Sequence, residues 1–292
     1  MIYSVPEFMA ITRLNMTHII TVPAFSDNYI WLICDNNKQY AAIVDPGEAD
    51  PVIAVLEKQK IQAVAILITH FHYDHGNGIS GLLDKYPGIP VYGPQSEFEL
   101  LNEDFYSPHY GPASKYFNLL THPLIGGEKI KLDKVAVNLE VMNIPGHTSG
   151  HIAYYGDQKL FCGDTLFAGG CGRVFNGTLN KLHNSLQKIA KLPEETQIYC
   201  AHEYTLDNIG FAKWVEPDNI AVQKREQDAM ALIDADLATV PSPLSLELQT
   251  NPFLRTHLPS VKARVETKTN KKLVNASEVF AAMRTWKDTE YD

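Results

Sequence analysis

Residues 66–78 read ILITHFHYDHGNG, and this short stretch decides what kind of fold the chain can have. It places His70, His72, Asp74 and His75 directly after a run of apolar residues. Imidazoles and carboxylates gain nothing from burial unless they find polar partners, because removing them from water costs free energy. They are also the groups that bind first-row metal ions, and a catalytic metal site keeps one position open for water. The stretch therefore predicts a metal site.

The local backbone is expected to bring these four side chains together. His70 and His72 are two residues apart on an extended segment, so their side chains point to the same side. Asp74 and His75 lie where the chain turns into the sequence GNG at 76–78, and neighbouring residues in a turn can diverge toward a second ion. Glycines at this place allow the tight turn.

Three further polar residues follow apolar runs later in the chain. IPGHTSGH places His147 after a Pro-Gly turn, FCGDTLF places Asp164 after a strand and a glycine, and IYCAHEY places His202 after another strand. Each of these alone is more often structural than a ligand. Together with the first cluster they give five histidines and two aspartates, enough to hold two ions with one shared carboxylate.

The remaining chain shows strands and helices up to about residue 203 and helix patterns alone beyond it. Strand patterns lie at 18–23, 29–34, 40–45, 64–69, 90–92, 135–141, 151–155, 160–162 and 198–200. Helix patterns lie at 51–59, 79–85, 95–101, 181–190, 205–214, 218–234, 261–267 and 277–287. Asp50 is the expected N-cap of the first of these helices and Ser277 that of the last. This division predicts an α/β domain followed by a smaller helical domain.

Composition excludes several classes of function. The chain has 292 residues, 45% of them hydrophobic and 20% charged, as is typical of a globular protein. Its net charge is −9 and its Lys and Arg residues form no run, so we expect neither a nucleic-acid nor a membrane partner. No apolar stretch approaches the roughly 20 residues of a membrane span.

The cysteines and the N-terminus bear on location. Cys34, Cys162, Cys171 and Cys200 lie far apart without a CxxC pair, which favours a reducing, cytoplasmic setting over a disulfide framework. Residues 1–15 lack a strand or helix pattern and the apolar core of a signal peptide, so we expect them to be an extension before the fold.

The order of the motifs, HxHxDH, then PGHT, then GD and a late His, resembles the metallo-β-lactamase superfamily. The segments CGDTLFAGGCGR, YCAHEYT and NPFLR resemble glyoxalase II, the hydroxyacylglutathione hydrolases. The resemblance implies an αββα sandwich at 16–202 and a helical substrate-binding domain at 203–292. It also implies hydrolysis of the thioester of S-(2-hydroxyacyl)glutathione in methylglyoxal detoxification, with S-D-lactoylglutathione giving D-lactate and glutathione.

Carried over motif by motif, the resemblance assigns the metal ligands. One ion is held by His70, His72 and His147, the other by Asp74, His75 and His202, and Asp164 bridges them. Two divalent ions are expected, with Zn as the first choice and Fe or Mn as alternatives, because His and Asp accept all three. A water between them is expected to attack the thioester as hydroxide, with Asp74 orienting it. Asp45 of the DPG motif is expected to support the site without binding an ion.

The resemblance also implies residues that bind glutathione: Arg173, Phe175, Tyr204, Arg284 and Lys287. Phe175 stands where a Tyr is common, which removes one hydroxyl contact. Arg284 and Lys287 are three residues apart and should be neighbours on one side of the last helix, as an anchor for the glycine carboxylate. The apolar residues of that helix recur at helical spacing and should face the core: Val279, Phe280, Met283 and Trp286.

Three other functions fit parts of the pattern. A persulfide dioxygenase shares the superfamily motif, but it uses one iron and lacks a helical domain carrying Arg-x-x-Lys. A nuclease of this fold would need a basic surface, and a non-enzymatic scaffold should have lost ligands. The glutathione thioester is thus the expected partner, and the chain is expected to act as a monomer.

A few polar residues are expected to have no role in catalysis. The segment 102–118, rich in aromatic residues and prolines, is expected to be a surface loop with His109 exposed. The other histidines are expected to be structural: His18, His122, His151, His183 and His257.

Overall fold

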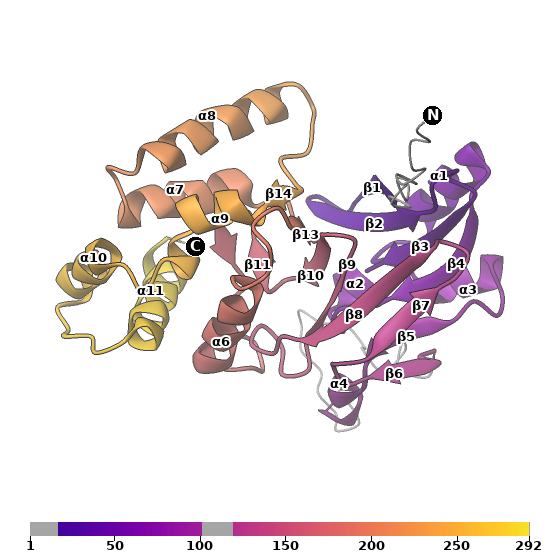
Figure 1. The fold of residues 1–292 in the computed structure, drawn as a ribbon, viewed down its shortest axis with the longest axis horizontal. Coiled ribbons are helices and arrows are strands. Elements are labelled where there is room, and N and C mark those ends of the chain that lie inside the picture. The colour runs from indigo at the N-terminus through magenta and orange to yellow at the C-terminus, as the bar shows by residue number, and fades with distance from the viewer. Residues whose placement is uncertain (1–16, 101–118, 292) are drawn as a thin grey trace, which may run out of the picture.

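Two six-stranded sheets form the centre of the computed structural model, which describes residues 17–100 and 119–291 (Figure 1). The first sheet, in the order β1-β2-β3-β4-β5-β6, contains β1 (His18–Ala24), β2 (Asn28–Cys34), β3 (Tyr40–Val44), β4 (Gln62–Leu67), β5 (Val91–Pro94) and β6 (His122–Leu124). The second, in the order β14-β13-β10-β9-β8-β7, contains β7 (Lys129–Leu132), β8 (Val137–Asn143), β9 (Ile152–Gly156), β10 (Lys159–Gly163), β13 (Gln197–Cys200) and β14 (Ser242–Pro243). A separate hairpin joins β11 (Leu166–Phe167) to β12 (Gly170–Cys171).

The strands of the first sheet are apolar on both faces because both faces are covered. In β2, Ile30 and Leu32 pack in one cluster with Val52 and Leu56 of α1 (Asp50–Gln59). The alternate residues, Trp31 among them, belong to the cluster between the two sheets. The sheet is therefore an inner layer of a sandwich.

Helices form the outer layers and the C-terminal part. The first sheet is accompanied by α1, α2 (Tyr73–Gly76), α3 (Ile79–Lys85) and α4 (Gln95–Leu100). The second sheet is followed by α6 (Leu179–Ile189), and the C-terminal part contains α7 (Thr205–Val215), α8 (Ile220–Asp234), α9 (Leu244–Thr250), the short 3-10 helix η1 (Pro252–Leu254), α10 (Pro259–Thr269) and α11 (Ala276–Glu290). Figure 1 shows these C-terminal helices gathered beside the sandwich. The predicted αββα sandwich with a following helical domain is confirmed.

Three local predictions are wrong. The region after residue 203 is not purely helical, because β14 pairs antiparallel with β13 at the edge of the second sheet. Ala49 is the N-cap of α1, and Asp50 lies in the first turn, where its negative charge is stabilised by the positive end of the helix dipole. Asn275 caps α11 by accepting a hydrogen bond from the Glu278 backbone N–H (3.0 Å), so Ser277 lies inside the helix.

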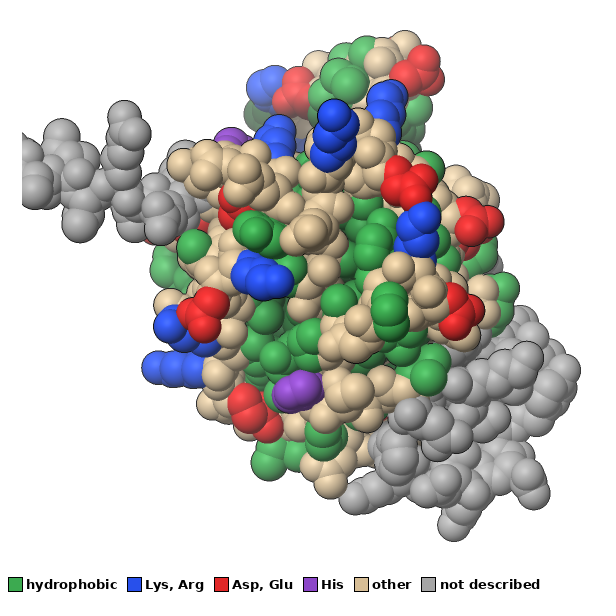
Figure 2. Space-filling model, turned by 90° about the vertical axis from the view of Figure 1, so that its right-hand side faces the viewer, with side chains coloured by type: hydrophobic (Ala, Val, Ile, Leu, Met, Phe, Trp, Pro, Cys, Tyr) green, Lys and Arg blue, Asp and Glu red, His purple; other side chains and the backbone are tan. Residues whose placement is uncertain are grey.

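Other predictions lie outside the described residues or concern the surface. The proposed extension at 1–15 and the whole segment 102–118, His109 included, lie outside the described residues. Figure 2 shows the end of the sandwich away from the helical domain, with hydrophobic side chains in its middle and charges of both signs around them. None of the helices within the described ranges is long and apolar enough to span a membrane.

Candidate metal centre

All seven candidate ligands lie just beyond the ends of strands, on one edge of the sandwich. His70 and His72 follow β4, and the short helix α2 then carries Asp74 and His75. The other three follow β8, β10 and β13, respectively: His147, Asp164 and His202. Strand ends thus bring together residues that are far apart in the sequence.

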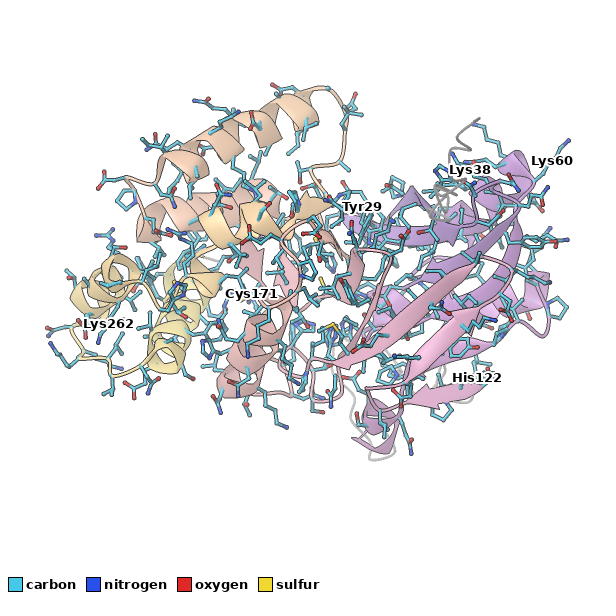
Figure 3. The ribbon with its side chains drawn as sticks, viewed as in Figure 1. Tyr29, Lys38, Lys60, His122, Cys171 and Lys262 are labelled. Carbon is cyan, nitrogen blue, oxygen red and sulfur yellow. The ribbon has the colours of Figure 1, made fainter. Side chains whose placement is uncertain are left out.

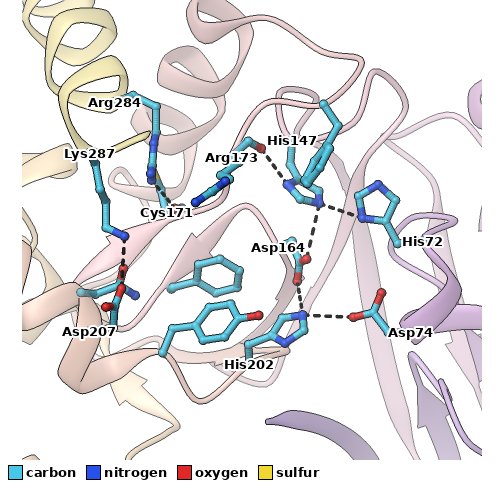
Figure 4. A pocket seen from close by; sticks show the side chains of 14 residues that line it. His72, Asp74, His147, Asp164, Cys171, Arg173, His202, Asp207, Arg284 and Lys287 are labelled. Atoms are coloured by element: carbon cyan, nitrogen blue, oxygen red, sulfur yellow. Dashed lines mark hydrogen bonds and ion pairs between the residues drawn. The ribbon is translucent and has the colours of Figure 1, made fainter. Parts of the chain in front are cut away.

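The ligand atoms form two groups, within each of which they lie no more than 4.8 Å apart. The first contains His70, His72, His147 and Asp164, and the second contains Asp74, His75 and His202. In the first group, the Nε2 atom of His147 lies 3.0 Å from the Nδ1 atom of His72. Both nitrogens therefore border the same small space (Figure 4).

Asp164 faces both groups with different oxygens. Its Oδ2 atom lies 3.4 Å from His147 Nε2 and 3.9 Å from His70 Nε2. Its Oδ1 atom lies 3.4 Å from the Nε2 atoms of both His75 and His202. This is the arrangement that a carboxylate shared between two cations requires.

Buried atoms without partners indicate that these residues fit metal ions. The Nε2 atoms of His70 and His75 and the Oδ1 atom of Asp164 are buried, and no described group hydrogen-bonds to them. Polar atoms are rarely left in this state unless an ion or water satisfies them. The nitrogen and oxygen donors are those of a catalytic divalent-metal site. The fold and its two ligand groups thus support divalent metal binding.

The opposite ring nitrogens are held by the protein, which fixes the imidazole tautomers. The Nδ1–H group of His147 donates to the Arg173 carbonyl (2.7 Å), and that of His202 donates to Asp27 Oδ1 (2.7 Å). Asp45 accepts from His75 Nδ1 at 3.1 Å, which agrees with its expected supporting role. In each case the Nε2 atom is left to face the other candidate ligands.

Electrostatics differ between the two groups. Burial lowers the pKa of His70 and of His147, so these imidazoles are neutral at neutral pH. Burial also disfavours charge on His75 and His202, but the surrounding carboxylates, Asp164 foremost, together outweigh it and raise the pKa of both. Burial alone would raise the pKa of Asp164, yet the two imidazoles lower it. A bound divalent ion would supply the positive charge that these protons supply in its absence.

A cavity of about 610 Å³ joins this centre to the helical domain. Its lining includes all five predicted glutathione-binding residues, Arg173, Phe175, Tyr204, Arg284 and Lys287. The Phe175 ring lies 5.1 Å from His72 and 5.0 Å from His147, and Tyr204 stacks on His202 at 4.7 Å. The structure therefore brings the predicted glutathione-binding residues to the same cavity as five of the candidate ligands: His72, Asp74, His147, Asp164 and His202 (Figure 4).

The two basic residues of α11 are buried and not on a solvated face. Arg284 is 1% exposed, donates to the Cys171 carbonyl (3.0 Å) and pairs with Asp288 (2.8 Å). Lys287 is 4% exposed, and its Nζ atom lies 3.2 Å from Asp207 Oδ2. Buried cations that border a cavity are suited to bind an anionic ligand.

Several supporting residues were missed by sequence reasoning. Asn28 donates to Asp74 Oδ2 (2.8 Å), and Asp27 holds His202. Buried Glu97 accepts from the backbone N–H groups of Phe71 (2.8 Å) and Gly150 (3.2 Å), which ties the His70–His72 loop to the loop after His147. His151 is no member of either ligand group, but its Nε2 atom accepts from the Asp164 backbone N–H (3.2 Å).

Two family models match the chain. Residues 25–202 match the metallo-β-lactamase superfamily, and residues 203–290 match the hydroxyacylglutathione hydrolase C-terminus. Among solved structures, the chain is similar to the BLEG-1 B3 metallo-β-lactamase (24% identity, TM-score 0.60, 81% of this chain and 99% of that one). It is also similar to a metallo-β-lactamase from Staphylococcus aureus (20% identity, TM-score 0.57, 93% and 71%). At these identities the likeness shows the fold alone.

Curated relatives are much more similar in sequence. The hydroxyacylglutathione hydrolase of Nitrosomonas europaea is 44% identical over 273 residues, which cover 94% of this chain and 96% of the relative. That of Aliivibrio salmonicida is 46% identical over 275 residues, covering 94% and 99%. With both family models and near full-length relatives in agreement, the chain belongs to the hydroxyacylglutathione hydrolase family within the metallo-β-lactamase superfamily.

Proposed function

We propose that this protein is a hydroxyacylglutathione hydrolase that converts S-D-lactoylglutathione to D-lactate and glutathione. The observation that carries the proposal is the single cavity that joins two metal-ligand groups to the basic pair of α11. The part of this cavity at the ligand groups suits hydrolysis, and the part at Arg284 and Lys287 suits an anionic tripeptide. The family match at 203–290 supports the same substrate class.

The proposed ligands are those of the two groups. His70, His72 and His147 would hold one ion, Asp74, His75 and His202 the other, and Asp164 both. We propose zinc as the first choice, with iron or manganese as alternatives, because imidazole and carboxylate accept all three. When bound, such ions supply an activated water near neutral pH and a charge that polarises the thioester carbonyl.

The chain's own residues would orient the reaction. Asp74 borders the cavity, and Asn28 fixes its carboxylate by donating to Oδ2 at 2.8 Å, so Asp74 is suited to orient the attacking water. The bond between the acyl carbon and sulfur breaks, and glutathione leaves as a thiolate. Because a thiolate is a good leaving group, no strong general acid is needed. None of the described residues has to protonate the sulfur.

The remaining cavity residues would bind glutathione. Arg284 and Lys287 would hold the glycine carboxylate by charge-assisted hydrogen bonds. Phe175 and Tyr204, whose rings contact candidate ligand imidazoles, and Arg173, which also lines the cavity, would contact the rest of the tripeptide. In this proposal, residues 16–202 form the catalytic domain, 203–292 form the substrate-binding domain, and the enzyme acts as a cytoplasmic monomer.

The direct test follows thiol release from S-D-lactoylglutathione and measures the metal content of the same sample. We expect hydrolysis with two ions per chain, and loss of both activity and bound metal after chelation. Asp164→Ala should abolish activity, because it removes the shared carboxylate. Full activity with one ion per chain would contradict the two-metal proposal, and a metal-loaded protein that releases no thiol would contradict the function.

A further inference from the structure

The β11–β12 hairpin connects the candidate bridging ligand to the cavity wall. It begins two residues after Asp164 and ends two residues before Arg173. Leu166 pairs with Cys171, and Phe167 pairs with Gly170. Figure 3 shows Cys171, on β12, between the helical domain and the sandwich.

The base of this hairpin is part of the metal centre. The Arg173 carbonyl accepts the Nδ1–H hydrogen bond of His147 at 2.7 Å and so orients that imidazole. Gly172 leaves no room for a side chain, because a Cβ atom there would lie 2.0 Å from the Asp164 carbonyl oxygen and 3.0 Å from His147 Nδ1. A shift of the hairpin would therefore press Gly172 against the Asp164 backbone and the His147 imidazole, which belong to two candidate ligands.

The tip of the hairpin is held by side chains of the helical domain. Asn251 Nδ2 donates to the Phe167 carbonyl (3.2 Å) and to the Gly170 carbonyl (2.8 Å). Asn208 Nδ2 donates to the Ala168 carbonyl (3.2 Å). Glu247 Oε2 accepts from the Gly169 backbone N–H (2.9 Å). Every residue of the tip, from 167 to 170, is thus bonded to the helical domain.

Glu247 and Asn251 are themselves fixed and fully buried. Glu247 forms an ion pair with Arg225, accepts from Ser242 Oγ (2.5 Å) and accepts from Asn251 Nδ2 (3.1 Å). A buried ion pair is an expensive way to stabilise a fold, since desolvation offsets much of the attraction. The ion pair fixes Glu247 against the tip of a hairpin whose base contacts the candidate metal centre, and this position points to a role beyond stability.

We propose that Asn251 and Glu247 are positioning residues for the metal centre. They fix the tip of the β11–β12 hairpin, and the hairpin transmits that position to Asp164 and to the carbonyl that orients His147. The helical domain then does more than bind glutathione: it sets the geometry of the first ligand group. This proposal rests on the proposed function only for the turnover measurement. Metal affinity and hydrogen exchange test it independently of that function.

The test compares Asn251→Ala and Asn251→Asp with the wild-type protein. Ala removes both hydrogen bonds to the hairpin, and Asp keeps the size of the side chain but cannot donate to two carbonyls. Both variants should bind metal about 10- to 100-fold more weakly in chelator competition, the usual effect of losing a group that orients a ligand. The peptide spanning 164–173 should exchange its amide hydrogens faster in both metal-free variants. Turnover should fall in kcat with little change in KM.

A matched control separates positioning from general stability. Val265→Ala creates a cavity at a buried position of α10, in the same domain, without touching the hairpin, and should lower the melting temperature. Its metal affinity and kcat should equal those of the wild type at temperatures where both are folded. Wild-type metal affinity in both Asn251 variants, or an equal loss of affinity in Val265→Ala, would overturn the proposal. If the wild type released no thiol, the proposed function would fail, while chelator competition and hydrogen exchange would still decide the positioning role.

Discussion

Asp45 connects the orienting hydrogen bonds of both ligand groups. Its Oδ2 atom accepts from His75 Nδ1 (3.1 Å) and from Thr69 Oγ1 (2.7 Å), and that hydroxyl lies 3.1 Å from His70 Nδ1. Because the Thr69 hydroxyl gives its proton to Asp45, it accepts the Nδ1–H group of His70. The backbone of Asp45 has a left-handed φ of 50°, which Asp and Asn tolerate better than most residues.

Asp45→Asn should therefore keep the backbone and lose the orientation of the ligands. The Oδ1 atom of Asp45 accepts from the Thr69 backbone N–H group (2.8 Å), while Oδ2 accepts from Thr69 Oγ1 and His75 Nδ1. An amide has one oxygen, so it must turn its NH₂ group toward one of these donors. We expect kcat/KM and the affinity for metal to fall about 10- to 100-fold. The measurements are thiol release and chelator competition.

Asp157→Asn is the matched control for that substitution. Asp157 also has a φ of 50°, but it lies in the turn between β9 and β10 and pairs with Lys159. Its replacement should leave metal binding and turnover unchanged. Equal behaviour of the two variants would show that Asp45 supports the backbone and not the imidazoles.

At this scale the motif predicted candidate ligands that the structure brings together, but not the residues that orient them. The spacing HxHxDH is a local signal, whereas the contact between Asp27 and His202 joins residues 175 positions apart. Asp27 lies in the turn between β1 and β2, and Asn28 begins β2, so after Ser26 both read as ordinary turn residues. No pattern in the sequence distinguishes such a turn from one that supports a metal ligand.

At the scale of elements, α11 shows what helical periodicity can and cannot predict. The predicted core residues Val279, Phe280, Met283 and Trp286 are buried. The pattern also predicted that Arg284 and Lys287 share a side, but not that both are buried. Their burial depends on β12 and α7, which supply the Cys171 carbonyl and Asp207.

Because the two cations have different contacts, their replacements should differ. Lys287→Met removes a charge remote from the ligand groups, so it should raise KM with kcat little changed. The loss in kcat/KM should be about 1–3 kcal/mol, the scale of a hydrogen bond to a charged group, and should shrink at high salt. Arg284→Met also removes a bond to the hairpin strand β12, so both KM and kcat should change.

Steady-state kinetics at two salt concentrations test this difference. Lys262→Met serves as the control, since Figure 3 shows Lys262 in the outer part of the helical domain, away from Cys171, and Lys262 does not line the cavity. An unchanged KM in Lys287→Met would exclude Lys287 from substrate binding.

The ion pair between Arg225 of α8 and Glu247 of α9 should make the free energy of unfolding depend on pH. Burial alone would raise the pKa of Glu247, but Arg225 and the hydrogen bonds from Ser242 and the Gly169 backbone together outweigh it, so the pKa of Glu247 in the folded state is lowered. A lowered folded pKa means stability that is present above the unfolded pKa of about 4.3 and lost as pH falls through the folded value. Glu247→Gln, which leaves Arg225 buried without its partner charge, should cost about 3 kcal/mol at pH 7.

Urea unfolding of both proteins between pH 7 and pH 3 measures this contribution. The difference in unfolding free energy should stay constant down to about pH 5 and shrink below about pH 4, because the protonated wild type then resembles the Gln variant. A difference that is independent of pH would show that the ion pair does not cause it.

At the scale of the whole molecule, the sequence predicted the inner strands of the two sheets better than the strands at their edges. The inner strands are long apolar runs and were predicted to within a few residues. The two-residue strands β11 and β12, which lie outside both large sheets, were missed. The other missed strands are short edge strands: β7 has four residues, β6 has three with a proline in the middle, and β14 has two, one of them proline. A proline removes a hydrogen-bond donor, so such strands occur at edges and carry little local signal. Their pairing is decided by the sheet that they join.

The two proposed domains share one hydrophobic core, and this has a thermodynamic consequence. One cluster of buried residues continues from Trp31 and Val141 in the sheets, through Leu186 of α6, to Phe253 and Phe280 in the helical domain. Unfolding either part alone would expose the apolar surface of the other, at roughly 25 cal/mol per Å². We therefore expect a single cooperative transition with equal calorimetric and van 't Hoff enthalpies.

Metal binding provides a second test of the single unfolding transition. An ion that binds only the folded state raises the melting temperature of the cooperative unit that contains its ligands. No described residue of α8 or α10 belongs to either ligand group. If the sandwich and the helical domain unfold together, adding metal to the metal-free protein should raise the one transition. It should also slow the global hydrogen exchange of α8 and α10 as much as that of β4. Two calorimetric transitions, of which metal shifts only one, would show that the shared cluster does not couple the domains.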